Sequence, residues 1–197
     1  MRPSNDGHRR GNLHPVAPTR PSGPNAPRSR GRSPGRRGSE TGWPPAGPVD
    51  RKTLDELFEL ARWAPNHHWT NPWRFRVLGP GALARLKQAA GSEQESKLGR
   101  APTLIIVSAA LSGGPLQDEE DLHATAIAVY IVLLVAHARG LAGYWRTPAV
   151  LRTLEGRTAV GLTDEEHVLG LIHPGRPHQQ SSAPERETLS ACVTYLD

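Results

Sequence analysis

One short loop, residues 64–73, holds the densest group of side chains that could do chemistry. It reads APNHHWTNPW and contains two histidines, two asparagines, two tryptophans and a threonine. Side chains of this kind, on a loop between rigid elements, commonly form a binding site. Two other interpretations remain open. His67 and His68 could bind a metal ion, or Trp69 and Trp73 could pack the loop against the domain as a purely structural segment.

We expect no metal site at this loop, because side chains adjacent in sequence point apart and no HExxH motif or cysteine partner is evident. Cys192 is the only cysteine in the chain. A single cysteine excludes an internal disulfide framework and a Cys-rich zinc site. It also fits a reducing compartment.

The elements that must position the loop are a helix before it and a strand after it. Asp50 is a candidate N-cap, and the apolar residues Leu54, Leu57, Phe58 and Ala61 follow at the spacing of one helical face. Pro65 ends this helix near Trp63. The alternation of apolar and basic residues over 73–77 then predicts a half-buried strand.

The rest of the chain predicts an α+β sandwich around one modest sheet. The expected helices lie at 82–90, 118–140 and 148–154, and the expected strands at 103–108, 141–146 and 168–172. The acidic run 118–121 complements the dipole of the helix that it opens. Because that helix is apolar on all sides over 124–138, it should be central, and it would also suit a dimer core. Residues 187–196 are left without an assignment.

The basic charge of the chain is confined to its N-terminal part. Residues 1–47 contain nine Arg, nine Pro and eight Gly with only two acidic residues, a formal charge of +7, whereas the remaining 150 residues carry −2. We therefore expect a disordered arm over residues 1–35 and a folded domain over residues 36–197. A basic nucleic-acid-binding core is excluded as the simplest interpretation, and only the arm could bind nucleic acid or an acidic partner.

No membrane segment is expected. The longest apolar run, 124–136, is shorter than the roughly 20 residues that a spanning helix needs. The N-terminal residues also lack the apolar stretch of a secretory signal. We expect a cytoplasmic protein.

Several motifs, in this order and spacing, resemble those of the nitroreductase family, and its short single-domain bacterial members most of all. The loop with the following Arg74-Phe75 resembles the family's Ala-Pro…Pro-Trp-x-Phe signature. Pro48-Val49-Asp50, Arg100-Ala101-Pro102, Gly143-Tyr144-Trp145-Arg146-Thr147 and Gly175-Arg176-Pro177 are similar to further family segments.

The resemblance implies a homodimer with a mixed sheet flanked by helices, a long central helix and FMN bound at the dimer interface. It also implies an enzyme that uses NAD(P)H to reduce small-molecule acceptors such as nitroaromatics and quinones by a ping-pong two-electron mechanism. The flavin N5 supplies the chemistry in such an enzyme, so no catalytic side chain is expected.

The resemblance places FMN-binding positions in four segments of the chain. They are Arg36, Arg37 and Ser39; Trp63, His67 and Asn71; Trp145, Arg146 and Thr147; and Arg176. The first segment matches a phosphate-binding Arg-Arg-Ser with Gly38 inserted, and Trp63 stands where the family usually has Arg. An arginine such as Arg146 can pair with anionic oxygens, and a tryptophan such as Trp145 can pack on a flavin ring.

Two alternatives to this function stay open. The chain could be a flavin-free relative that acts as a binding or interaction protein through its basic arm. It could also perform another flavin reaction on the same fold, such as flavin destruction or reductive dehalogenation.

Overall fold

The computed structural model describes residues 47–111, 113–177 and 185–196. In chain order, the elements are α1 (Arg51–Ala61), the 3₁₀ turn η1 (His67–Trp69), β1 (Trp73–Val77), α2 (Pro80–Leu98), β2 (Ile105–Ala110), α3 (Pro115–Ala138), β3 (Ala142–Arg146), η2 (Ala149–Arg152), α4 (Leu154–Ala159), β4 (Glu166–Gly175) and η3 (Leu189–Ala191). The predicted arm over 1–35, its boundary with the domain, and Arg36, Arg37 and Ser39 lie outside the described residues.

The four strands form one sheet in the order β1-β2-β4-β3, which confirms the α+β prediction. The expected mixed sheet is instead antiparallel in all the pairings of the described strands. The reason lies in the connections. The chain between β1 and β2, through α2, and the chain between β3 and β4, through η2 and α4, each return to the sheet at the end where they left it, like an enlarged hairpin.

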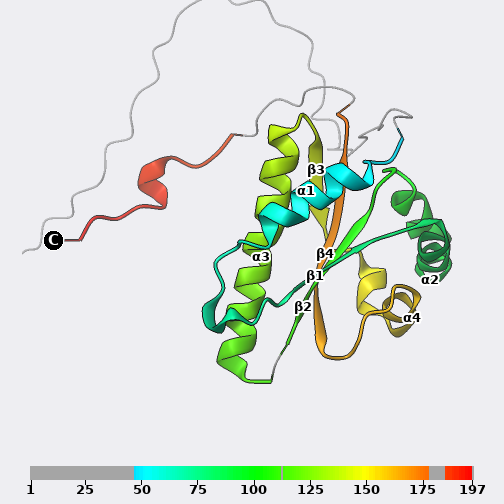
Figure 1. The fold of residues 1–197 in the computed structure, drawn as a ribbon, viewed down its shortest axis with the longest axis horizontal. Helices are drawn as coiled ribbons and strands as arrows, with labels where there is room; N and C mark the ends of the chain where they lie inside the picture. Colours follow the sequence, from blue (N-terminus) through cyan, green and yellow to red (C-terminus); the bar gives the residue numbers. More distant parts are fainter. Residues whose placement is uncertain (1–46, 112, 178–184, 197) are drawn as a thin grey trace, which may run out of the picture. The chain divides into compact units, whose positions relative to one another are not determined.

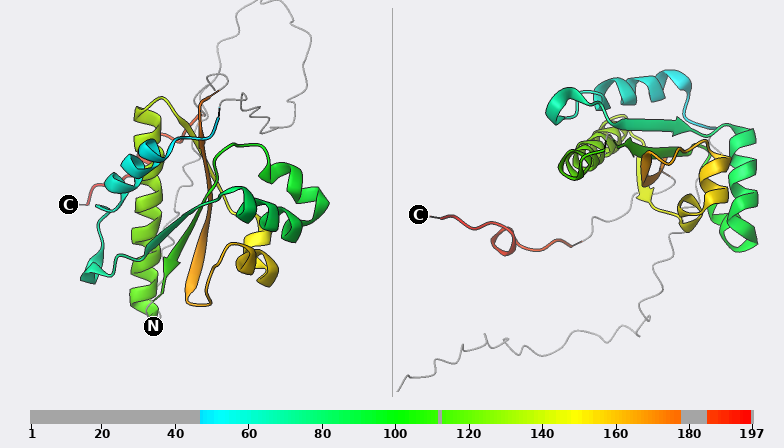
Figure 2. Two further views of the ribbon diagram at one scale, coloured as in Figure 1. Left: turned by 45° about the vertical axis from the view of Figure 1, so that its right-hand side comes forward. Right: turned by 90° about the horizontal axis from the view of Figure 1, so that it is seen from below.

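Helices cover both faces of the sheet (Figures 1 and 2), with α1 and α3 on one face and α2 and α4 on the other. Strand β2 shows why. Ile105 and Val107 pack with α1 and α3, whereas Leu104 and Ile106 pack with α2 and α4. The uniformly apolar run at 103–108 is therefore buried on both faces, as predicted.

Helix α3 is the central helix, but it is not covered all round. Its inner face is buried against the sheet and α1, whereas Ile127, Tyr130 and Leu134 are exposed on its outer face. It is also the one described helix that is long and apolar enough to cross a bilayer. Because one face packs into the core and carries the buried carboxylate of Asp121, we assign α3 to the core of a globular domain.

Two helices extend beyond the expected ranges. The helix expected at 82–90 continues to Leu98, because Gly91 takes a left-handed φ of 71° and lets the chain resume a helix after the kink. Helix α3 starts at Pro115 rather than at 118, since proline is well suited to the first position of a helix. The predicted N-cap is confirmed, because Asp50 Oδ1 accepts a hydrogen bond of 2.9 Å from the Thr53 N–H.

The last strand is longer than predicted at both ends. It begins at Glu166 and runs through Pro174. Proline is accepted there because β2 pairs with β4 only as far as Ile172, so Pro174 has a partner strand on one side alone, at Gly143. Residues 185–196 are exposed and contain only the turn η3.

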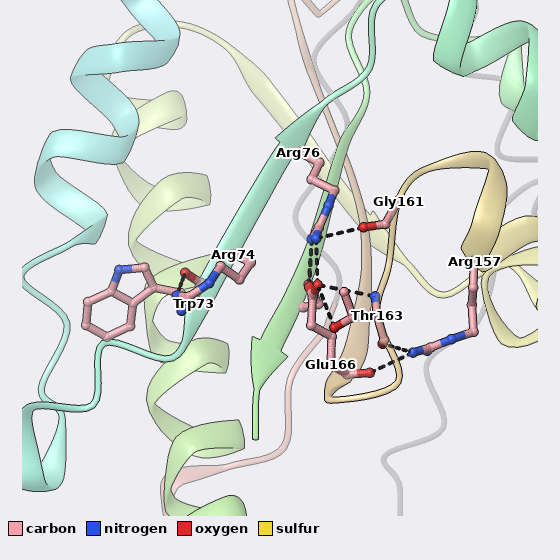
Figure 3. Close-up of polar contacts among 8 residues, drawn as sticks. Trp73, Arg74, Arg76, Arg157, Gly161, Thr163 and Glu166 are labelled. Carbon is pink, nitrogen blue, oxygen red and sulfur yellow. Dashed lines mark hydrogen bonds and ion pairs between the residues drawn. The ribbon is translucent and has the colours of Figure 1, made fainter. Parts of the chain in front are cut away.

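A polar network joins three strands on the α4 face of the sheet (Figure 3). Arg76 of β1 holds the Glu166 carboxylate with two hydrogen bonds, of 2.6 and 2.7 Å. The buried hydroxyl of Ser108, on β2 between them, donates to the same carboxylate. Arg76 also donates to the Gly161 carbonyl, and Arg157 of α4 donates to the Glu166 carbonyl. The network fixes the register of these strands and holds the loop between α4 and β4.

Candidate functional site

The loop after α1 has an unusual backbone that one asparagine organises. His68, Trp69 and Asn71 have φ values of 57°, 56° and 49°, a left-handed region that residues other than glycine seldom adopt. The Asn66 side chain compensates for this strain. Its Oδ1 accepts a hydrogen bond of 2.7 Å from the Asn71 N–H, and its Nδ2 donates to the Thr70 hydroxyl. These hydrogen bonds hold the loop in its observed shape.

A buried carboxylate ties this loop to α3. Asp121 is fully buried, and its Oδ1 accepts hydrogen bonds from Thr70 Oγ1 at 2.5 Å and from Gln117 Nε2 at 3.1 Å. Its Oδ2 has no partner among the described residues. By sequence alone, the acidic run at 118–121 indicates only a helix-dipole role. In the structure, Asp121 instead anchors the candidate binding loop.

From the sequence, His67 and His68 were expected to point apart. In the structure they do not. Their rings stack, with centroids 3.8 Å apart, because the left-handed turn at His68 brings its side chain back over His67. His67 Nδ1 lies 2.8 Å from the Oε2 atom of Glu120 on α3. This carboxylate holds a proton on Nδ1 when the ring is neutral, so Nε2 is then left as a hydrogen-bond acceptor.

The alternative that Trp69 and Trp73 together pack the loop against the domain is wrong for Trp69. Trp69 is 85% exposed and packs little, and only Trp73 joins the core cluster. Trp63, at the end of α1, is also largely exposed, with the Arg62 guanidinium 5.6 Å from its ring. The loop is held by polar contacts and leaves these two indoles open to a ligand.

The second candidate segment lies at the end of β3, where a bulge in β4 positions it. Val107 pairs with Gly170 and Ser108 with Val168, which leaves Leu169 as the extra residue. The Leu169 carbonyl accepts hydrogen bonds of 3.1 Å from both Trp145 Nε1 and Thr147 Oγ1.

Arg146 is held by a histidine that the sequence analysis did not single out. Arg146 Nε donates to His173 Nε2 at 3.0 Å, and Nη2 donates to the Lys97 carbonyl. Burial lowers the pKa of His173 to about 4, and the neighbouring Arg146 charge lowers it as well. At neutral pH His173 is therefore an uncharged acceptor, and burial also lowers the pKa of Arg146. Nη1 of Arg146 has no partner among the described residues.

The remaining predicted positions have different surroundings. Asn71 uses its side-chain amide within the loop, donating to the Trp69 carbonyl at 2.7 Å. Arg176 is exposed directly after β4. Within the described part of the chain, no hydrogen bond, ion pair or ring contact joins the loop to the β3 segment. Both segments adjoin α3, however, the loop through Glu120 and Asp121 and β3 through Gly143, which packs on Leu133.

A shallow cleft between α1 and β1 adjoins the loop only through Trp73. The stacked rings of Phe58 and Phe75 and the Trp73 ring line it, with charged residues at its rim. It contains none of the predicted site residues, so we do not assign it to the candidate site.

The sequence matches the model of the nitroreductase family over residues 46–176. The chain is 26% identical over 165 residues to "Putative NAD(P)H nitroreductase YfhC" of Bacillus subtilis (strain 168), covering 76% of this chain and 85% of that protein. It is 28% identical over 143 residues to "Putative NAD(P)H nitroreductase YdjA" of Escherichia coli (strain K12), and this match covers 66% of this chain and 78% of that protein.

Solved structures share the fold. A nitroreductase-like family protein from Bacillus cereus has a TM-score of 0.68 at 22% identity, covering 76% of this chain and 86% of that one. The FMN and NADPH-dependent nitroreductase NfnB from Sphigopyxis sp. strain HMH has a TM-score of 0.67 at 16% identity, covering 80% and 94%. The family match spans well over half of the chain, and the motifs that it covers are those that form the loop and the β3 segment. The chain belongs to the nitroreductase family.

Proposed function

We propose that this protein is an FMN-dependent oxidoreductase that uses NAD(P)H to reduce small-molecule acceptors, with nitroaromatics and quinones as the expected classes, by a ping-pong mechanism. The observation that carries the proposal is the β3 segment. Trp145 and Thr147 are fixed by one carbonyl, Arg146 is fixed by His173, and the Trp145 side chain remains 38% exposed. Family membership and the names of the relatives support it.

The residues present fit a flavin mononucleotide. When bound, FMN supplies the two-electron chemistry, and the protein supplies binding and electrostatics. Trp145 offers an apolar face for the ring, and Arg146 a positive charge for anionic oxygens. His67 offers Nε2 from the other segment, since its Nδ1 faces Glu120, and the indole of Trp63 is exposed at the end of α1. For the phosphate we propose Arg36, Arg37 and Ser39, with Arg176 as a further cation.

We further propose that the active form is a homodimer with FMN between the subunits, in the cytoplasm. The outer face of α3 supports the dimer. Ile127, Tyr130 and Leu134 form an exposed apolar stripe at i, i+3 and i+7. The same face of the helix begins at Glu120, which holds His67, and Leu133 beside the stripe packs on β3. A second copy seated on the stripe would therefore adjoin both candidate segments.

Replacing Tyr130 with Glu should shift the protein from dimer to monomer, because a charge would be buried in an apolar interface. Light scattering at micromolar concentration measures this directly. Leu154→Glu is the matched control, since Leu154 is at least as exposed as Tyr130 but lies on α4, on the opposite face of the sheet. A wild-type protein that is monomeric with flavin fully bound would contradict the dimer proposal.

The purified protein should absorb near 450 nm, as oxidised flavin does.

Replacing His67 with Ala should weaken FMN binding by roughly tenfold. This corresponds to about 1.4 kcal/mol, near the upper end of the net free energy of one hydrogen bond between uncharged groups. His68→Ala should change it less, because only His67 matches a family contact. Flavin dissociation constants from fluorescence titration check this. Equal constants for the two variants would count against the role of His67, and a colourless protein that cannot be reconstituted would favour a flavin-free binding protein.

A further inference from the structure

The loop and the start of α3 bring together three side chains that can ligate a metal ion. One ligand atom from each of His67, His68 and Glu120 lies within 4.8 Å of the other two. The donors come from two segments that are 53 residues apart in the chain. Stacking of the two imidazoles and the 2.8 Å contact between His67 and Glu120 hold them near one another before any ion is present.

The backbone that creates this cluster is held by residues outside it. The left-handed φ of 57° at His68 is what turns its ring toward His67. Asn66 and Thr70 hold that backbone, and Thr70 is tied in turn to the buried Asp121. Because none of these three residues is needed as a ligand, the loop can keep its shape when the cluster binds an ion.

We propose that His67, His68 and Glu120 bind one divalent first-row transition-metal ion of the zinc class. Two imidazole nitrogens and one carboxylate oxygen are the donors that Zn²⁺ prefers, with bonds of about 2.0–2.2 Å. Ligand atoms on a tetrahedral zinc ion are then about 3.3 Å apart. From spacings of up to 4.8 Å, the ligand atoms must approach one another, and the two stacked rings must rotate so that both nitrogen lone pairs point at the ion. Mg²⁺ and Ca²⁺ prefer oxygen ligands, so they should not bind here.

The site has three protein ligands and is open to solvent. His67 and His68 are both exposed and Glu120 is partly exposed, so a water molecule or another small ligand would complete the coordination. This inference does not depend on the proposed flavin chemistry, because His68 and Glu120 have no assigned flavin contact. The ion replaces the proton on His67 Nδ1, the atom that faces Glu120, so Nε2 of the same imidazole is left for FMN if His67 contacts it.

The test is a calorimetric titration of the full-length, tag-free protein with Zn²⁺ alone. The wild-type protein should bind one ion per chain with a dissociation constant in the micromolar range or below. His68→Ala and Glu120→Gln should each weaken Zn²⁺ binding at least tenfold. Removing a residue that only hydrogen-bonds a metal ligand already weakens metal binding by about 10–100-fold, and removing a ligand should cost no less. His137→Ala, which removes an exposed histidine at the other end of α3, is the matched control and should leave the constant unchanged.

The Glu120→Gln variant keeps the size of the side chain and removes only its charge, so it separates ligation from a folding defect. Thermal melting without metal should give the same midpoint for this variant as for the wild type, within about 2 °C. The proposal would be overturned if the Zn²⁺ dissociation constants of His68→Ala and Glu120→Gln were both within twofold of the wild-type value. The absence of binding to the wild type at 100 µM Zn²⁺, a concentration chosen as roughly tenfold or more above the expected constant, would also overturn it.

Discussion

Replacing Glu166 with Gln is expected to lower the free energy of unfolding by about 3 kcal/mol at pH 7, because it leaves the charge of Arg76 without its partner in a mostly buried setting. Glu166 is only 8% exposed and bonds to Arg76 and to the buried Ser108. Urea denaturation measures the change. Glu59→Gln removes a similar contact, with Arg62, from an exposed site on α1 and should change stability by less than about 0.5 kcal/mol.

The same carboxylate should make the stability of the protein depend on acid pH. Burial alone would raise the pKa of Glu166, but the hydrogen bonds and charge of Arg76 and the Ser108 hydroxyl outweigh it and lower the pKa from 4.5 to about 2. Its contribution is therefore complete above pH 4.5, the value for the unfolded chain, and is lost as the pH falls toward 2. The loss amounts to about 3 kcal/mol.

Stability curves at pH 7, 4.5 and 3 separate this group from the other carboxylates. The difference between wild type and Glu166→Gln should be largest at pH 7 and should shrink below pH 4.5, since Gln cannot titrate. A difference that stays constant between pH 7 and 3 would show that the variant acts through packing and not through the ion pair.

Replacing Gly170 with Ala should destabilise the protein by about 3 kcal/mol or more and displace the β3 segment. Gly170 has a φ of 147°, and an added Cβ would lie 2.6 Å from the Arg146 carbonyl oxygen and 2.6 Å from Trp145 Nε1. Backbone strain of this kind costs about 1–3 kcal/mol by itself. The clash with a backbone oxygen adds to it, because the paired strand cannot move aside.

A matched control separates strain from the clash. Gly140 also has a positive φ, of 73°, but an added Cβ would meet nothing within 4 Å. Gly140→Ala should therefore show the strain alone, about 1 kcal/mol. Thermal melting gives both values, and the tryptophan fluorescence of the protein should change more in Gly170→Ala, where the added Cβ meets Trp145. Equal melting temperatures for the two variants would mean that the bulge at Leu169 adjusts freely.

Local structure could be predicted from the sequence wherever a few neighbouring residues determine it. Asp50 capped its helix as predicted, since the cap bonds only three residues along the chain. The apolar run at 103–108 indicated a strand buried on both faces. The loop at 64–73 was singled out by composition alone, and the family resemblance followed from short motifs in order.

The contacts that give the candidate site its shape were decided only by the tertiary structure, because they join residues far apart in the chain. Glu120 and Asp121 read as helix-dipole charges in sequence, yet they hold a loop more than 50 residues earlier. His173 lies 27 residues from the Arg146 that it positions, and Glu166 lies 90 residues from Arg76. No local pattern encodes such a pair, since each partner alone is an ordinary polar residue. Each residue of such a pair gains its role only in the folded protein. There, packing of the sheet and helices removes water and leaves its distant partner as the available hydrogen-bonding group.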